Sequence, residues 1–154
     1  MGMLLERNDV SPDIADTEYS RTPLWLAANS GHEGVMTMLL GREDVNASKM
    51  DSLNRTPFSR AAKNGHEGAV RMLLERSDVN PDQADQSGQT PLLRAAQNGH
   101  EGVVRMLLER NEVNPGKADE CGQTPLSLAA RNGHEGVVKM LLERNHVDPK
   151  KVDP

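Results

Sequence analysis

The sequence predicts an all-α solenoid of stacked helix-turn-helix units, because one segment of 34 residues recurs four times. Two markers keep this period: Thr-Pro at 22–23, 56–57, 90–91 and 124–125, and Gly-His-Glu-Gly from 31, 65, 99 and 133. Repeats of about 20 to 50 residues are typical of solenoids, in which each unit covers the apolar face of its neighbour. One Phe, one Trp and one Tyr among 154 residues indicate a thin core of aliphatic side chains.

Each unit begins with a turn and a short helix, as the third unit illustrates. Asp-Gln-Ser-Gly at 85–88 is typical of a turn, and its glycine can take a positive φ. Thr90 and Pro91 predict an N-cap followed by proline in the first turn, where the missing N–H costs no hydrogen bond. Two alanines then give the helix a small-residue face, and Gly99 predicts its end.

The second helix of the unit is more apolar than the first. His100 and Glu101 open it, and the segment 103–108 is apolar almost all round, which is typical of a helix buried between others. Glu101 near the N-terminus and Arg110 near the C-terminus both suit the helix dipole. Asn114 precedes a proline, which favours extended backbone, so we expect a loop after this helix.

These residues resemble the ankyrin repeat family. The resemblance covers essentially the whole chain and rests on equivalents, in every unit, of Asp85, Gly88, 90–92, 95–96, 98–100, 103–104, 107–108 and 113–114. It implies antiparallel helix pairs in a curved array, with protruding β-hairpin or loop fingers. Repeats with these connections are similar to ankyrin arrays in some fungal proteins. The period is one residue longer than usual, and Trp25, Ser59, Leu93 and Ser127 replace the His that often follows Thr-Pro-Leu.

The repeat predicts a single domain over 1–154 with two cut edges. We expect a partial repeat at 1–15, full repeats at about 16–50, 51–84, 85–118 and 119–152, and the start of a truncated repeat at 153–154. The first finger holds one extra residue, within 16–20. The last repeat keeps its apolar residues, whereas terminal solenoid units normally carry a polar outer face. This is consistent with a piece of a longer array or with self-association through exposed terminal repeats.

Composition excludes several classes of function. A net charge of −5 argues against nucleic acid and anionic membranes as partners, because both attract a basic excess. The single cysteine forms no internal disulfide. The N-terminal residues do not resemble a signal peptide, and no apolar run approaches the ~18 residues of a membrane span. We therefore expect a cytoplasmic protein, with the nucleus as the alternative.

The His-Glu pairs predict joints in the scaffold and no metal site, cofactor or catalysis. A zinc site of the His-Glu-x-x-His type needs a second His one helical turn on, where Met36, Val70, Val104 and Val138 stand. No nucleophile has a base beside it in any repeated position. We therefore predict that the protein is not an enzyme, and we assign structural roles to Thr22, Pro23, Gly31, His32, Thr56, Pro57, Gly65, His66, Thr90, Pro91, Gly99, His100, Thr124, Pro125, Gly133 and His134.

Function then depends on the residues that vary between repeats, which fall in the fingers and first helices. By the resemblance, these line a concave face that binds a partner protein or peptide, and the arginines among them favour an acidic one. Trp25 is either a hot spot of binding or a packing residue. The candidate residues are Tyr19, Arg21, Trp25, Asn29, Leu53, Arg55, Arg60, Lys63, Ser87, Gln89, Arg94, Gln97, Cys121, Gln123 and Arg131. The alternative is an engineered, consensus-like or architectural repeat scaffold without an evolved partner.

Overall fold

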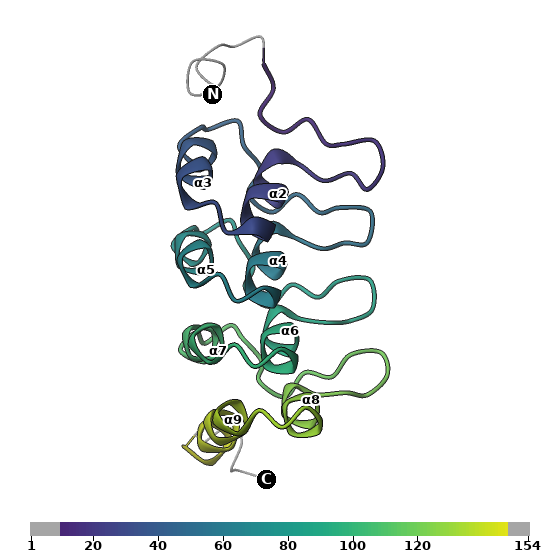
Figure 1. Cartoon of the computed structure of the whole chain (residues 1–154), viewed down its shortest axis with the longest axis vertical. Helices are drawn as coiled ribbons and strands as arrows, with labels where there is room; N and C mark the ends of the chain where they lie inside the picture. The colour runs from purple at the N-terminus through teal and green to yellow at the C-terminus, as the bar shows by residue number, and fades with distance from the viewer. Residues whose placement is uncertain (1–9, 148–154) are drawn as a thin grey trace.

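The protein is a stack of four helix pairs in a computed structural model that describes residues 10–147 (Figure 1). The first helices are α2 (Pro23–Ser30), α4 (Pro57–Lys63), α6 (Pro91–Gln97) and α8 (Pro125–Arg131). The second helices are α3 (Glu33–Leu40), α5 (Glu67–Leu74), α7 (Glu101–Leu108) and α9 (Glu135–Val147). Residues 10–147 contain no strand, so the fingers are loops. The predicted all-α solenoid is confirmed.

The ends of the first helices follow the predicted signals. Each is capped by a threonine whose side chain accepts a backbone N–H three residues on, at 3.0–3.1 Å. Each has proline in its first turn. The glycines that follow, Gly31, Gly65, Gly99 and Gly133, have φ between +74° and +75°. This left-handed conformation is strained for residues with a Cβ, so glycine turns the chain sharply into the second helix.

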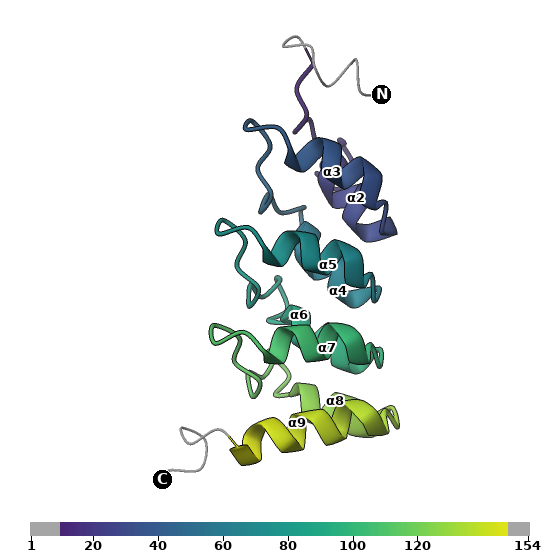
Figure 2. The same ribbon diagram turned by 90° about the vertical axis from the view of Figure 1, so that its left-hand side faces the viewer.

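The core lies between the two layers of helices and runs the length of the stack. Neighbouring first helices pack against one another along their alanines, of which Ala28, Ala62 and Ala96 have no exposed surface. The second helices bury one face only, so that Val104 and Leu107 are inaccessible while Arg105 is exposed. Figure 2 shows these helices side by side in one layer.

A histidine joins each repeat to the one before it. The Nε2 atoms of His66, His100 and His134 bond the carbonyl oxygens of Asn29, Lys63 and Gln97 at 3.1, 2.8 and 3.0 Å. Each imidazole also lies against the left-handed glycine of the preceding repeat. These bonds are the contacts that the predicted structural role of the three histidines requires. His32 differs, because its side chain is exposed and bonds no carbonyl of the described residues.

The loops between repeats add a second connection, which the sequence did not reveal. Arg76 donates from Nη1 to the carbonyl of Leu40 at 3.2 Å, and Arg110 donates to the carbonyl of Leu74 at 3.1 Å. These carbonyls end the second helix of the preceding repeat and have no partner within their own helix. Each arginine therefore caps a helix one repeat away.

The two ends of the stack depart from the regular pattern. In the first finger the N–H of Asp16 donates to the carbonyl of Arg21, whereas in the second the N–H of Asp51 donates to the carbonyl of Arg55. The loop closed by this bond is therefore one residue longer in the first finger, as the sequence predicted. At the other end, α9 runs to Val147 and is longer than the other second helices. The sequence predicted a loop there. The partial repeat predicted at the N-terminus and the start of a repeat at 153–154 lie partly or wholly outside the described residues.

We predict that Gly99→Ala destabilises the protein more than Gly133→Ala. Both glycines have φ +75°, so both substitutions carry the same backbone penalty of about 1–2 kcal/mol. A Cβ at position 99 would lie 2.6 Å from Nδ1 of His134, whereas a Cβ at position 133 would have no atom within 4 Å. Displacing His134 weakens its bond to Gln97, which adds about 1 kcal/mol. Urea unfolding of the two variants measures the difference, and equal costs would contradict the histidine joint.

Candidate functional site

Each finger is held in shape by an aspartate at its base. Oδ1 of Asp51 accepts the N–H groups of Leu53 and Arg55 at 3.0 and 2.8 Å. Asp16, Asp85 and Asp119 accept the corresponding pairs in the other fingers. A carboxylate that accepts two backbone N–H groups fixes the turn in one conformation. The loops are therefore ordered without forming strands.

Backbone hydrogen bonds link the fingers in a row. Ser52 N–H donates to the carbonyl of Tyr19 at 2.9 Å, Gln86 N–H to that of Leu53 at 3.1 Å, and Glu120 N–H to that of Ser87 at 3.1 Å. The fingers consequently project in the same direction, on the side of the first helices (Figure 1). A hollow of about 410 Å³ lies between them and α6, lined by Leu53, Arg55, Asp85, Gln86, Ser87, Arg94 and Glu120.

The predicted partner-binding residues lie on this one side of the stack, which we call the finger face: residues 16–21, 51–55, 85–89 and 119–123 with the open side of the first helices. Tyr19, Leu53, Ser87, Cys121 and Arg131 are exposed. Partly buried are Arg21, Asn29, Arg55, Arg60, Lys63, Gln89, Arg94, Gln97 and Gln123. The variation between repeats also reaches buried positions, because Ser59 and Leu93 are covered.

A family model decides the identity of the fold. The model described as ankyrin repeats, in three copies, matches residues 2–85 and again 77–153. The chain belongs to the ankyrin repeat family. No curated protein matches it. Ankyrin repeats generally mediate protein–protein interactions and are typically not enzymes.

Metal-binding clusters and membrane-spanning helices are absent from the described part of this ankyrin array. Within residues 10–147, no three side chains of His, Cys, Asp or Glu are placed to hold a metal ion. None of the described helices is long and apolar enough to cross a membrane. Cys121 is exposed in the last finger and has no disulfide partner.

Trp25 was a candidate for contact with a partner, but the structure buries its side chain. Only 3% of its surface is exposed, and its Nε1 donates to the carbonyl of Arg55 at 3.2 Å. The indole thus packs between the first two repeats instead of standing open to a partner. Its ring supports guanidinium groups that remain partly exposed, those of Arg21, Arg55 and Arg60, at 5.3–5.6 Å from the ring centre.

The cations of the finger face are only partly neutralised. Arg21 pairs with Asp16 at 2.7 Å, Arg55 with Asp51 at 2.7 Å, and Arg94 with Asp85 at 3.6 Å. In the last repeat, Arg131 donates to the side-chain oxygen of Gln123 at 3.0–3.1 Å when that amide is oriented to bond Asp119. Arg60 and Lys63 have no ion pair with any described residue.

The surroundings of Arg60 and Lys63 disfavour their charged forms. Burial, followed by repulsion from Arg55 and Arg94, lowers the pKa of Arg60. Burial, followed by repulsion from Arg60, Arg94 and Arg55, lowers the pKa of Lys63. Both groups remain cationic near neutral pH, because arginine and lysine ordinarily titrate far above it. Arg60 and Lys63 thus place positive charge on the finger face without an ion pair among the described residues, although Asp51 and Asp85 also attract Arg60.

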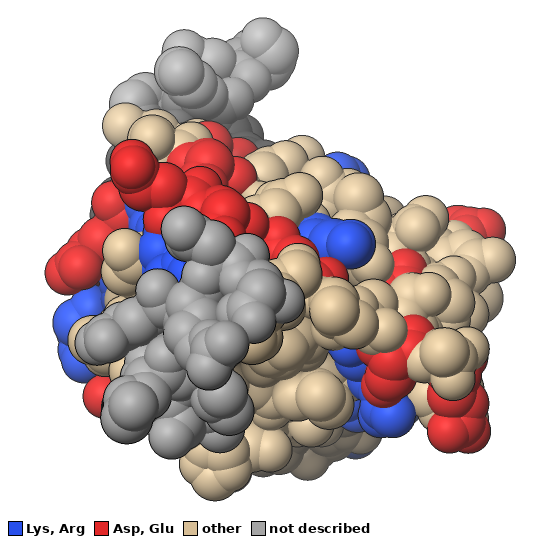
Figure 3. Space-filling model, turned by 90° about the horizontal axis from the view of Figure 1, so that it is seen from above, with Lys and Arg blue, Asp and Glu red and all other residues tan. Residues whose placement is uncertain are grey.

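Acidic residues gather elsewhere on the array. Figure 3, which looks along the stack, shows Asp and Glu at the side of the second helices and their loops and again towards the fingers. The loop acids Asp44, Asp78 and Glu112 pair with Arg42, Arg76 and Arg110 in their own loops. The acids of the loops thus have cationic partners beside them, whereas the finger face mixes the acids of the fingers with the cations of the first helices.

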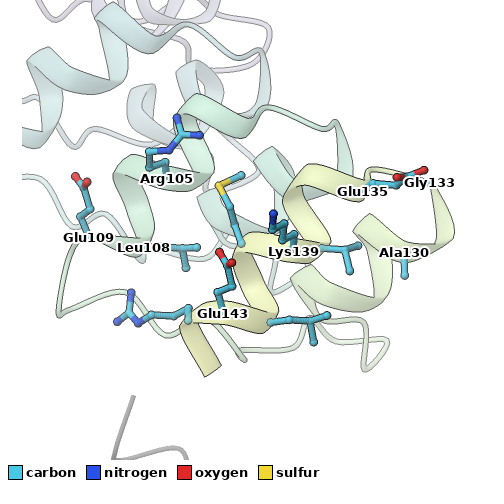
Figure 4. A pocket seen from close by; sticks show the side chains of 12 residues that line it. Arg105, Leu108, Glu109, Ala130, Gly133, Glu135, Lys139 and Glu143 are labelled. Carbon is cyan, nitrogen blue, oxygen red and sulfur yellow. The ribbon is translucent and has the colours of Figure 1, made fainter. Parts of the chain in front are cut away.

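A second hollow lies at the last helix pair (Figure 4). It has a volume of about 1180 Å³ and is lined by α7, α8 and α9. Ala130 and Leu142 are exposed there, and 52% of Leu142 is accessible. The equivalents of Ala130 in the three earlier repeats are fully buried by the repeat that follows. The hollow is therefore the repeat-stacking surface of the last described unit.

We predict that the carboxyl group of Asp16 titrates with a midpoint near 2. The N–H of Tyr19, and then the N–H and guanidinium of Arg21, lower the pKa of Asp16 from 3.8 to about 2. Because the folded pKa is depressed, this stabilisation is present above pH 3.8 and is lost as the pH falls through about 2. The carboxyl carbon shift in an NMR titration measures the midpoint. A midpoint near 3.8 would show that the first finger is not held by Asp16.

Proposed function

We propose that this ankyrin array is a non-catalytic interaction module that binds a protein or peptide through the finger face. The observation that carries the proposal is the row of hydrogen-bonded fingers, which presents exposed side chains from four repeats on one surface. Most of these side chains are not needed to stack the repeats. These side chains can therefore differ between repeats in a way that suits a partner, without loss of stability.

A rigid surface of this kind suits binding. Association costs free energy for every loop that becomes ordered, so a preorganised loop lowers that cost. Here the aspartates and the bonds between fingers order the loops in the free protein. The uncompensated charge of Arg60 and Lys63 favours a partner with negative charge on the contacting surface. The expected compartment remains the cytoplasm or the nucleus.

The finger face can be tested with ligands selected from a displayed peptide library. Arg94→Ala changes the hollow between the fingers and α6, and we expect it to weaken most selected ligands about tenfold, as loss of a charged hydrogen bond does. Arg71→Ala removes the same charge from the exposed side of α5 and should change affinity less than about twofold. Calorimetry measures both. Ligands that depend on Arg71 and not on Arg94 would overturn the proposal.

We also propose that the hollow at α9 pairs with a second copy of the chain. The exposed side chain of Leu142 and the uncovered Ala130 and Gly133 favour this, because the same positions in earlier repeats stack against another repeat. Apolar surface left open in this way promotes association.

Light scattering after size exclusion tests the pairing across a range of protein concentrations. We expect a concentration-dependent dimer whose affinity falls about tenfold or more in Leu142→Glu, because burying a leucine contributes about 1.5–3 kcal/mol. Met38→Glu is the matched control, since Met38 is 46% exposed on α3, far from α9 in the stack (Figure 2). A monomer at all concentrations would contradict self-association, and equal effects of the two variants would contradict pairing at the hollow of α9.

A further inference from the structure

Trp25 gathers three guanidinium groups at the junction of the first two repeats. The Cζ atoms of Arg60, Arg55 and Arg21 lie 5.3, 5.5 and 5.6 Å from the centre of its ring. Cation–π attraction extends to about 6 Å and gains strength where the indole is shielded from water. The 3% exposed ring of Trp25 meets this condition. We call Arg21, Arg55, Arg60 and Lys63 around Trp25 the tryptophan cluster.

Arg60 holds the only guanidinium in this cluster without an ion pair among the described residues. Asp16 and Asp51 neutralise Arg21 and Arg55. Arg60 instead donates from Nε to the amide oxygen of Asn29 at 2.9 Å, which orients the side chain without cancelling its charge. Its two Nη groups bond no described residue, and neither is sealed from solvent. The two Nη groups of Arg60 are therefore free to bind a ligand.

Lys63 adds a second charge close to the first. It follows Arg60 by three residues on α4, which places the two side chains on the same face of the helix. After burial, repulsion from Arg60, and then from Arg94 and Arg55, lowers the pKa of Lys63. An anion bound between them would relieve this repulsion.

We propose that Arg60 and Lys63 form the anchor point for an acidic segment of a partner protein, with one carboxylate on the Nη groups of Arg60 and another on Lys63. This inference rests on the proposed function of the finger face. It adds the chemistry of the ligand and the position at which it binds.

The geometry suits carboxylates, and it lacks one element that is common in phosphate sites. Phosphate sites commonly add backbone N–H groups at a helix N-terminus to the cationic side chains. At α4 that end is closed by a capping box between Thr56 and Ser59. Arg60 has two parallel donors left, which match the two oxygens of one carboxylate in a bidentate pair.

The single tryptophan of the chain makes the site directly observable. We expect a short glutamate-rich peptide, added to the intact chain, to change the fluorescence of Trp25 in a saturable manner. The affinity should fall as salt is raised, because the charges are partly exposed and a salt concentration of 0.1 M screens them over about 10 Å. The same peptide with glutamine in place of glutamate should produce no change.

Matched substitutions assign the binding to the anchor. Arg60→Gln should weaken the glutamate peptide about tenfold or more, as loss of a charge-assisted pair does. Arg71→Gln makes the same chemical change on α5 and should leave affinity within about twofold. Peptide affinity is measured by calorimetry as well as fluorescence, because Arg60 lies against the indole. Thermal unfolding checks that both variants remain folded.

Three results would overturn the anchor. The first is a glutamate peptide that does not bind, the second is equal weakening by Arg60→Gln and Arg71→Gln, and the third is inorganic phosphate that binds and competes more strongly than the peptide. The finger-face proposal fails separately, if library ligands do not respond to Arg94→Ala. Ligands that need Arg94 but not Arg60 would refute the anchor alone.

Discussion

The bond between a histidine and the carbonyl of the preceding repeat is the interaction on which the stack depends. It joins the turn of one repeat to the turn of the next, and it requires a glycine at the point of contact. Glycine is needed at this point for two reasons, which apply to Gly31, Gly65 and Gly99. The backbone has a positive φ in the turn, and the absence of a Cβ leaves room for the imidazole of the next repeat. The same glycine in each of these repeats is therefore needed both for the turn and for packing against the next repeat.

A fixed spacing between repeats has consequences at a distance from the turns. With the helices held in register, the fingers come close enough to bond one another through Ser52, Gln86 and Glu120. These bonds involve backbone atoms, so the finger side chains remain free to vary. The side chains of the finger face can therefore vary without a change in the stack, which is the property that an interaction module needs.

The helices were predictable because their signals are local. Thr90, Pro91 and Gly99 act within a few residues of themselves, and the repeated His100 indicated a structural joint through its period alone. The caps of Arg76 and Arg110 act across a repeat on carbonyl groups, which every residue carries, so no residue type at the acceptor indicates them. The continuation of α9 was missed for a different reason. Residues 143–147 resemble the residues that form loops after the second helices of the earlier repeats, so the sequence predicted a loop there too.

The positions of the varying residues were predictable from the sequence, but their burial and their ionic partners were not. Periodicity placed the varying residues on the fingers and first helices, and this is where the structure has them. It could not show that Trp25 is covered, because burial depends on the neighbouring repeat and on Arg55, whose carbonyl accepts its N–H. Nor could it show which arginines have acidic partners. A net charge of −5 suggests an acidic protein, yet the pairing of Asp16, Asp51 and Asp85 leaves Arg60 and Lys63 unpaired among the described residues. The proposed binding of an acidic partner would depend on these two charges, because 0.1 M salt limits the reach of the more distant acidic loops to about 10 Å.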